Sequence, residues 1–212
     1  MMCSLGVGPL PVLLARHVKE LWETSLDDRR AAGGQKEYLT KLAVPTIDFD
    51  AVKVDYHNEV LGGVPSEQPK SVDALLFDKG GAPVFVEFKN GKIDKRTSYA
   101  LHGKLYDSVL AYCDVTGSAL ADLRERASFL VVYNEERNSL EDLRESGGPY
   151  DIAAAPSRAS IANAISAKAK KPFVRFGLER FIGYCFKNIE TVTGSDLADC
   201  LRRHAVDIGC AD

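Results

Sequence analysis

Two apolar runs joined by a glycine turn constrain this chain more strongly than any other stretch of its sequence. Residues 71–89 read SVDALLFDKGGAPVFVEFK, with the turn near the middle. Short apolar runs on either side of a glycine-containing turn predict a β-hairpin. If residues 79–81 form a three-residue loop, the strand ladder places Asp73 directly opposite Glu87.

This pairing would gather charged side chains on one face of the hairpin. Directly opposed residues of an antiparallel pair have Cβ atoms about 5 Å apart, and successive side chains alternate between the two faces. Lys89 therefore shares a face with Asp73 and Glu87, while the apolar residues between them point the other way. The sequence predicts two carboxylates and one amine on a single patch.

Such a patch has a chemical use. Two carboxylates this close repel each other and need a proton or a cation between them. A hard ion such as Mg²⁺ or Mn²⁺ would bind Asp73 and Glu87, and the backbone carbonyl of Phe88 would add a third ligand. A water on that ion becomes a better nucleophile, and Lys89 would orient it or neutralise a phosphate. The alternative for the same residues is a surface hairpin in which Lys89 forms a cross-strand salt bridge.

The pattern as a whole, Asp73, thirteen intervening residues and then Glu87-x-Lys89, resembles the PD-(D/E)XK nuclease superfamily. The resemblance implies a restriction-endonuclease-like fold, with Asp73 and Glu87 as ligands of Mg²⁺ and Lys89 as the catalytic lysine. Val72 stands where the name of the motif has proline, a departure common in the superfamily. The motif itself covers residues 71–89, and the order of the elements extends a looser similarity over most of the chain.

The same resemblance suggests two accessory residues. Members of the superfamily often place a polar residue of the helix after the Glu-x-Lys strand against the site, and Lys104 is the candidate for a phosphate contact. Its alternative is a solvated lysine on an ordinary helix face. Many members also carry a glutamate on an early helix. Glu37 is preferred, with Glu20 and Glu23 as rivals, and an exposed helical glutamate is the alternative for each.

The remaining pattern predicts an α/β fold in which a mixed central β-sheet is flanked by helices. Helices are predicted over residues 9–28, 35–43, 97–115, 139–146 and 157–171, with a last one opening at Ser195. Strands are predicted over 49–57, in the hairpin, over 128–133 and once or twice within 180–192, and residues 61–70 form a loop. We expect a single domain over residues 1–212, with residues 1–8 disordered.

Composition limits the class of protein. The 212 residues are 45% hydrophobic and 27% charged, as in a soluble globular protein, and no apolar run is long enough to span a membrane. Five cysteines without a CxxC pair suggest reduced thiols and a cytoplasmic protein. The four histidines show no metal-ligand spacing, so we expect them to have ordinary structural or surface roles.

Charge bears on the expected partner. The net charge of -3 gives no general attraction to nucleic acid, so DNA binding would need a local basic patch. One basic cluster consists of Arg158, Lys168, Lys170, Lys171 and Arg175. It is either a contact to a phosphate backbone or a solvated helix end.

We therefore expect a Mg²⁺-dependent or Mn²⁺-dependent nuclease whose partner is a nucleic acid, with DNA preferred over RNA. One alternative is a nuclease-fold module that has lost catalysis and binds a nucleic acid or a protein. Another is a hydrolase or transferase acting on a different phosphate-bearing substrate. The chain has no GxSxG, P-loop or GxGxxG motif, which argues against serine hydrolases, nucleotide kinases and dinucleotide oxidoreductases.

Overall fold

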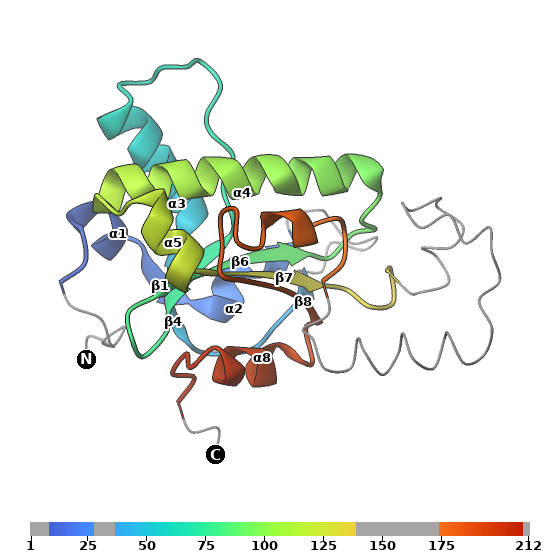
Figure 1. Cartoon of the computed structure of the whole chain (residues 1–212). Helices are drawn as coiled ribbons and strands as arrows, with labels where there is room; N and C mark the ends of the chain where they lie inside the picture. The colour runs from blue at the N-terminus through green and yellow to red at the C-terminus, as the bar shows by residue number, and fades with distance from the viewer. Residues whose placement is uncertain (1–8, 28–36, 139–173, 210–212) are drawn as a thin grey trace.

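The computed structural model describes residues 9–27, 37–138 and 174–209 (Figure 1). The predicted helices over 139–146 and 157–171, and the predicted disorder of residues 1–8, lie outside these ranges. Of the predicted basic cluster, only Arg175 lies within them.

A mixed six-stranded sheet forms the centre of the described structure, with the strand order β1-β4-β5-β6-β7-β8. Neighbouring strands are antiparallel from β1 to β6, while β7 and β8 are parallel to β6. The strands are β1 (Val18–Glu20), β4 (Pro45–Asp48), β5 (Ala74–Phe77), β6 (Pro83–Lys89), β7 (Ser128–Tyr133) and β8 (Asn188–Thr193). A separate two-stranded ribbon pairs β2 (Leu26–Asp27) with β3 (Glu37–Tyr38). The predicted mixed α/β class is confirmed.

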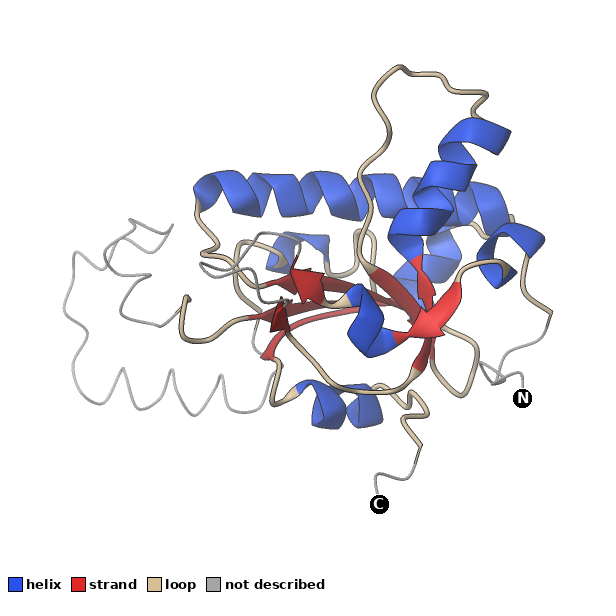
Figure 2. Ribbon diagram, turned by 180° about the vertical axis from the view of Figure 1, so that it is seen from behind, coloured by secondary structure: helices blue, strands red, loops and turns tan. Residues whose placement is uncertain are grey.

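Helices cover both faces of this sheet, as Figure 1 and the reverse view in Figure 2 show. The long helix α4 (Lys95–Thr116) lies across one face and α8 (Leu197–Arg203) lies on the other. The α4 face also carries α1 (Val12–Ala15), α3 (Phe49–Asp55) with its π-helical continuation η1 (Tyr56–Val60), α5 (Leu120–Arg126) and the 3₁₀ turn η2 (Glu179–Phe181). The short helix α2 (Leu21–Thr24) contributes to the α8 face.

The central strands are apolar because both of their faces are covered. β6 and β7 are buried along almost their whole length, which favours near-continuous apolar runs over strict alternation. On the α4 face, the ring of Phe85 packs edge-on against Tyr112 and Phe186, with centroids 5.4 Å apart in each pair. Within β6, Glu87 is therefore a charged residue placed inside a double-sided core.

The hairpin, the helix over 97–115 and the strand over 128–133 are confirmed, as β5–β6, α4 and β7. The loop over 61–70 is also confirmed. The segment 180–192 provides one sheet strand, β8, which begins at Asn188. The final helix begins at Leu197, with Asp196 at its N-cap, and α5 was not predicted.

The predicted helix over residues 9–28 is wrong. This segment forms two helices of four residues each, separated by the edge strand β1. Val18 pairs with Ile47 of β4, and Lys19 Nζ lies 2.6 Å from Asp48 Oδ2 across the same pair of strands. Pairing with a distant strand, which a local pattern does not reveal, thus overrides helical spacing.

The predicted helix over 35–43 is also wrong. Within its described part, residues 37–38 form β3 and residues 39–43 have no regular secondary structure. The carbonyl groups of Leu42 and Val44 accept hydrogen bonds from the amides of Trp22 and Leu21, at 3.1 and 2.9 Å. The segment thereby satisfies the free N–H groups at the start of α2.

The predicted strand over 49–57 is wrong as well, because this segment is the helix α3 and the start of η1. Asp48 caps the helix by accepting a hydrogen bond from the amide of Ala51 at 3.0 Å. Phe49, Val52 and Tyr56 are buried at helical spacing. Both signals were present in the sequence.

Candidate active site

The hairpin has the register that its turn predicts. The amide of Asp78 donates to the carbonyl of Ala82 at 2.9 Å, and the amide of Asp73 donates to the carbonyl of Val86 at 3.1 Å. The β5–β6 ladder runs from Phe77 opposite Pro83 to Ala74 opposite Val86, so Asp73 and Glu87 lie directly beyond its last pair. β5 begins one residue after Asp73, while β6 runs on to Lys89, so the site lies where one strand starts and its neighbour continues.

A lysine from α4 joins the two carboxylates. Lys104 Nζ lies 3.1 Å from Asp73 Oδ1 and 2.9 Å from Glu87 Oε1. The two carboxylates therefore lie within about 6 Å of each other, close enough to share one ion with two direct ligand bonds and modest side-chain movement. Lys89 Nζ contacts Glu87 Oε1 from its own strand. The predicted convergence of Asp73, Glu87 and Lys89 is thus observed, and Lys104 contacts the carboxylates themselves.

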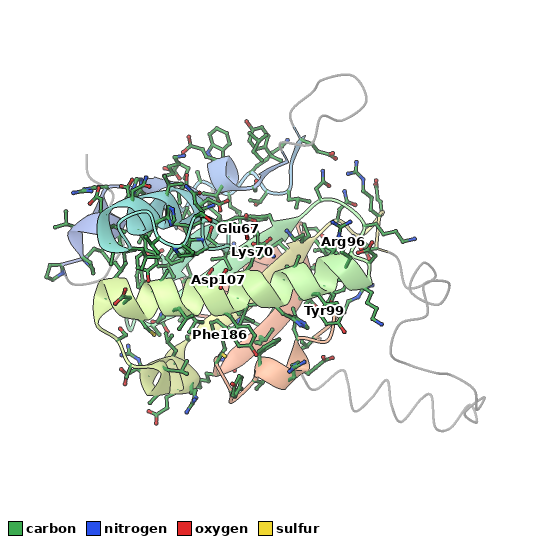
Figure 3. All side chains as sticks on the ribbon, turned by 90° about the horizontal axis from the view of Figure 1, so that it is seen from above. Glu67, Lys70, Arg96, Tyr99, Asp107 and Phe186 are labelled. Carbon is green, nitrogen blue, oxygen red and sulfur yellow. The ribbon has the colours of Figure 1, made fainter. Side chains whose placement is uncertain are left out.

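The loop before Asp73 is fastened to the same helix. The amide of Lys70 donates to Asp107 Oδ2 at 2.8 Å, and the amide of Val72 donates to Ser108 Oγ at 2.9 Å. Figure 3 shows Lys70 and Asp107 beside each other along α4. These two bonds fix the approach of Asp73 to the helix that carries Lys104, so the site is built on regular elements.

Burial makes the electrostatics of the pair strong. Glu87 is fully buried and the side chain of Asp73 is 16% exposed. Burial, followed by the charge of Glu87, raises the pKa of Asp73 to about 7, although Lys104 and Lys89 counteract the shift. Burial alone would lower the pKa of Lys104, but the charges of Glu87 and Asp73 outweigh it and hold that pKa above its usual value. Near neutral pH, Asp73 is therefore poised between its two protonation states, while Lys104 stays charged.

The donor set fits a hard divalent cation. Glu87 Oε1 is buried and accepts no hydrogen bond of regular geometry, so its contacts to the ammonium groups of Lys89 and Lys104 are electrostatic. Asp73 Oδ2 accepts a hydrogen bond from the amide of Phe88 at 2.6 Å. The carbonyl of Phe88 points to the same side of β6 as that of Val86, toward Asp73, because alternate residues along a strand direct their carbonyls alike. Three oxygen donors are thus available, and Lys104 supplies the positive charge between them.

A third acidic residue near the site was missed. Asp50, in the first turn of α3, accepts a hydrogen bond from Ser71 Oγ, and its Oδ1 lies 3.3 Å from Lys53 Nζ. Its charge also raises the pKa of Lys104. The prediction of a strand over 49–57 hid this residue, and the capping aspartate before a helical apolar pattern was the signal that could have found it.

Glu37 is not brought to the carboxylate pair. It lies on β3 and accepts hydrogen bonds from Asn90 Nδ2 at 2.7 Å and Arg137 Nη2 at 3.3 Å. It therefore supports the chain just beyond Lys89. Its rivals Glu20 and Glu23 form a capping box at α2.

Arg175 does not form a surface contact of the predicted kind. It is 7% exposed, its guanidinium lies 4.7 Å from the centre of the Tyr133 ring, and its Nη2 donates to the carbonyl of Asn138 at 2.8 Å. These contacts give it a structural role in the core.

A small cleft of about 110 Å³ opens beside Asp73. Its lining combines the end of β6, the start of α4 and the β2–β3 ribbon: Ser25, Leu26, Leu39, Asp73, Phe88, Lys89, Asn90, Gly91, Lys92 and Thr97. The lining thus includes side chains with ammonium, amide and hydroxyl groups, which are donors of the kinds that contact phosphate oxygens.

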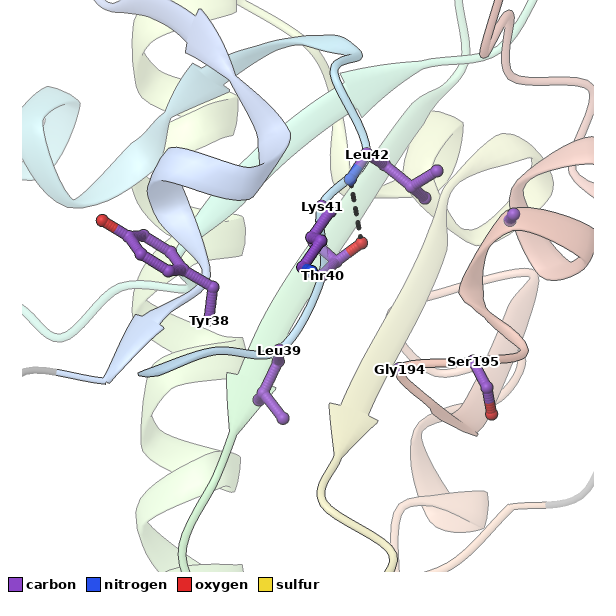
Figure 4. Close-up of a pocket in the computed structure, with 8 residues that line it drawn as sticks. Tyr38, Leu39, Thr40, Lys41, Leu42, Gly194 and Ser195 are labelled. Atoms are coloured by element: carbon purple, nitrogen blue, oxygen red, sulfur yellow. Dashed lines mark hydrogen bonds between the residues drawn. The ribbon is translucent and has the colours of Figure 1, made fainter. Parts of the chain in front are cut away.

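A larger hollow of about 380 Å³ lies elsewhere, between residues 38–42 and the start of α8 (Figure 4). The amide of Leu42 there donates to Thr40 Oγ1 at 3.2 Å. Its lining has one titratable cation, Lys41, and no carboxylate. Leu39 borders both hollows, but the chemistry converges at the smaller one.

No protein-family model, curated protein or solved structure matches the chain. Among the described residues, no helix is long and apolar enough to cross a membrane. The geometry around Asp73 and Glu87 is therefore the basis for a functional proposal.

Proposed function

We propose that the protein is a metal-dependent phosphodiester hydrolase of the PD-(D/E)XK type, with a restriction-endonuclease-like fold, acting on DNA. The observation that carries the proposal is the shared contact of Asp73 and Glu87 with one ammonium group at the edge of a polar cleft. A buried carboxylate on β6, a largely buried one just before β5 and a lysine two residues after Glu87 match the arrangement that the motif predicts.

In this proposal Asp73, Glu87 and the carbonyl of Phe88 hold Mg²⁺ or Mn²⁺. The ion, when bound, supplies Lewis acidity and a more acidic water. Glu87 is the anchor because it is fully buried on a central strand. Lys89, whose ammonium group is in contact with Glu87, is placed to orient the attacking water and to stabilise negative charge on the phosphate.

Lys104 has a second role in the same proposal. Its ammonium lies between the carboxylates, where a divalent ion would also bind. Like charges exclude each other from such a space, so Lys104 must move when the ion enters. Its side chain is 23% exposed, and in the displaced position it would contact a phosphate.

A second candidate function is a binding module without catalysis. The observation that favours it is again Lys104, because an ammonium group already neutralises the carboxylates without a metal. In that case the cleft would bind a nucleic acid or a protein partner, and the ion would be dispensable.

The distinguishing experiment is a cleavage assay on linear, circular and single-stranded DNA and on RNA, with Mg²⁺ or Mn²⁺ at low salt, where phosphate contacts are strongest. We expect wild type to cut DNA only with the metal and Glu87→Gln to be inactive. Lys79→Ala, at the exposed far end of the hairpin, is the matched control and should cut like wild type. Cleavage of RNA alone would revise the substrate. Binding without cleavage, unchanged in Glu87→Gln, would favour the binding module.

A further inference from the structure

A second cluster of metal-ligating side chains lies on the opposite face of the sheet, under α8. Glu190 projects from β8, and Cys200 and His204 follow at one-turn spacing along α8 and its C-cap. His204 Nε2 lies 2.7 Å from Glu190 Oε1, and Cys200 Sγ lies 3.7 Å from Glu190 Oε2. One ligand atom from each of the three residues lies within 4.8 Å of the others.

The cluster is inside the protein. Cys200 is fully buried, and the side chains of Glu190 and His204 are each 9% exposed. Solvated surface groups often approach one another by chance, but these three are held by a strand and a helix that pack through Leu197 and Leu201. The spacing is therefore a property of the fold.

The three donors suit zinc better than magnesium. A thiolate sulfur, an imidazole nitrogen and a carboxylate oxygen are the usual protein ligands of Zn²⁺, whereas Mg²⁺ takes oxygen ligands. Zn²⁺ bonds of about 2.0 to 2.3 Å place tetrahedral ligands roughly 3.5 Å apart. The distances from Glu190 to His204 and to Cys200, 2.7 and 3.7 Å, lie within about 1 Å of that value, and all three ligand atoms lie within 4.8 Å of one another, so side-chain rotations would accommodate the ion.

The outer contacts also fit a metal site. Histidine ligands usually donate a hydrogen bond from the N–H of their second ring nitrogen to an oxygen atom, and ligating carboxylates are themselves hydrogen-bonded. His204 Nδ1 lies 3.1 Å from Ser128 Oγ of β7, and Glu190 Oε2 accepts a hydrogen bond from Arg203 Nη2 at 2.8 Å. Arg203 can therefore keep its hydrogen bond to Glu190 Oε2 while Glu190 Oε1 binds the ion. The positive charge of Arg203 offsets part of the negative charge of the ligands.

We propose that Glu190, Cys200 and His204 form a zinc site that fastens α8 to β8, with water as the fourth ligand. The ion would replace the hydrogen on Cys200 Sγ, and that proton would leave to solvent. His204 would bind as a neutral imidazole through Nε2, with its one ring hydrogen on Nδ1 facing Ser128 Oγ. The site is independent of the proposed catalytic centre, which lies on the α4 face. The expectation that the histidines have only ordinary roles would then fail for His204.

The test measures zinc binding to the full chain after removal of metal, in the Asp73→Asn background so that the other carboxylate site contributes little. Competition with a chromophoric chelator should give one Zn²⁺ per chain. Co²⁺ in its place should show a thiolate-to-metal charge-transfer band. Cys200→Ser should abolish the band and weaken zinc binding by on the order of 100-fold or more, since a direct ligand matters at least as much as an outer one. Cys185→Ser, which changes another buried free cysteine, should leave both unchanged.

Folding is checked by circular dichroism and by the zinc-dependent rise in Tm, which mass action requires if zinc binds the native state. If Cys200→Ser does not fold, Ser128→Ala serves instead. It should keep the charge-transfer band and weaken zinc binding by about 10-fold to 100-fold. Absence of zinc binding by the folded protein, or equal affinity in Cys200→Ser and Cys185→Ser, would overturn the proposal and leave the cluster as a hydrogen-bonded network. In the Ser128→Ala arm, unchanged zinc affinity would overturn it in the same way.

Discussion

Lys104 Nζ lies 3.1 Å from Asp73 Oδ1, which joins a residue of α4 to the residue before β5, 31 positions earlier in the chain. The same nitrogen lies 2.9 Å from Glu87 Oε1. The ammonium therefore holds together two carboxylates that would otherwise repel, and it does so where the proposed ion would bind. Metal binding and the Lys104 ion pairs should consequently compete.

Replacing Lys104 should expose this competition. Lys104→Met should lower the free energy of unfolding without metal by about 3 kcal/mol, because it leaves the two carboxylates with Lys89 as the one remaining contacting ammonium group. Mg²⁺ should then restore more stability than it adds to wild type. Urea unfolding with and without Mg²⁺ measures both effects. Lys95→Met, an exposed change on the same helix, should behave like wild type, and a Lys104→Met protein that ignores Mg²⁺ would contradict the proposed ion position.

The raised pKa of Asp73 predicts a pH-dependent stability. The folded-state pKa, about 7, lies above the ordinary value of 3.8, so the folded protein keeps a proton that the unfolded chain loses. The contribution is complete below about pH 4 and is lost as the pH rises through 7, at about 1.4 kcal/mol per pKa unit. In metal-free buffer, the stability of wild type relative to Asp73→Asn should therefore fall between pH 4 and 7 and then level off. If the stability difference between wild type and Asp73→Asn did not change between pH 4 and 7, the pKa of Asp73 would not be raised in the folded protein.

Lys89 should act on turnover and leave the ion bound. Lys89→Ala should lower the cleavage rate by on the order of 100-fold, as removal of one preorganised electrostatic group does. Its Mn²⁺ affinity should not fall, because an ammonium group is not a metal ligand. Single-turnover rates together with Mn²⁺ titration separate the two effects. Equal rates in Lys89→Ala and wild type would remove Lys89 from the mechanism.

Gly194 should be essential to the close packing against the backbone of Leu39, a residue that lines both hollows. A Cβ at Gly194 would lie 2.3 Å from the carbonyl oxygen of Leu39, and backbone atoms cannot move aside cheaply. Gly194→Ala should therefore destabilise the protein by about 1–3 kcal/mol. Gly103→Ala, on α4 with only the Lys70 side chain nearby, should be neutral or stabilising. Thermal unfolding of the two variants compares them directly, and equal Tm values would argue against the close approach.

The sequence predicted the hairpin and its face correctly because both depend on local rules. Turn length sets the register, and strand alternation sets the face, so Asp73, Glu87 and Lys89 could be placed together before any coordinates. Lys104 was singled out by its position on the following helix, but its ion pairs with both carboxylates depend on how α4 packs and could not be read from spacing.

The N-terminal third was predicted poorly for a physical reason. Residues 18–20 and 45–48 become strands by pairing with each other, and residues 39–44 are held by the first turn of α2. Such pairings are non-local, so local periodicity does not record them. The wrong prediction of a strand at α3 has a different cause, because the helix signals there are local. Asp48 is a capping residue, and Phe49, Val52 and Tyr56 are buried at helical spacing. Glu190 was missed as a partner of His204 because a strand and a distant helix bring them together.

Anomalous X-ray scattering from a crystal soaked in Mn²⁺ would locate the proposed metal ion. We expect a peak between the carboxylates of Asp73 and Glu87, within bonding distance of the Phe88 carbonyl, with the Lys104 ammonium displaced from its place between them. A map in which Lys104 remains between the two carboxylates and no manganese lies beside them, at a concentration that supports DNA cleavage, would contradict it.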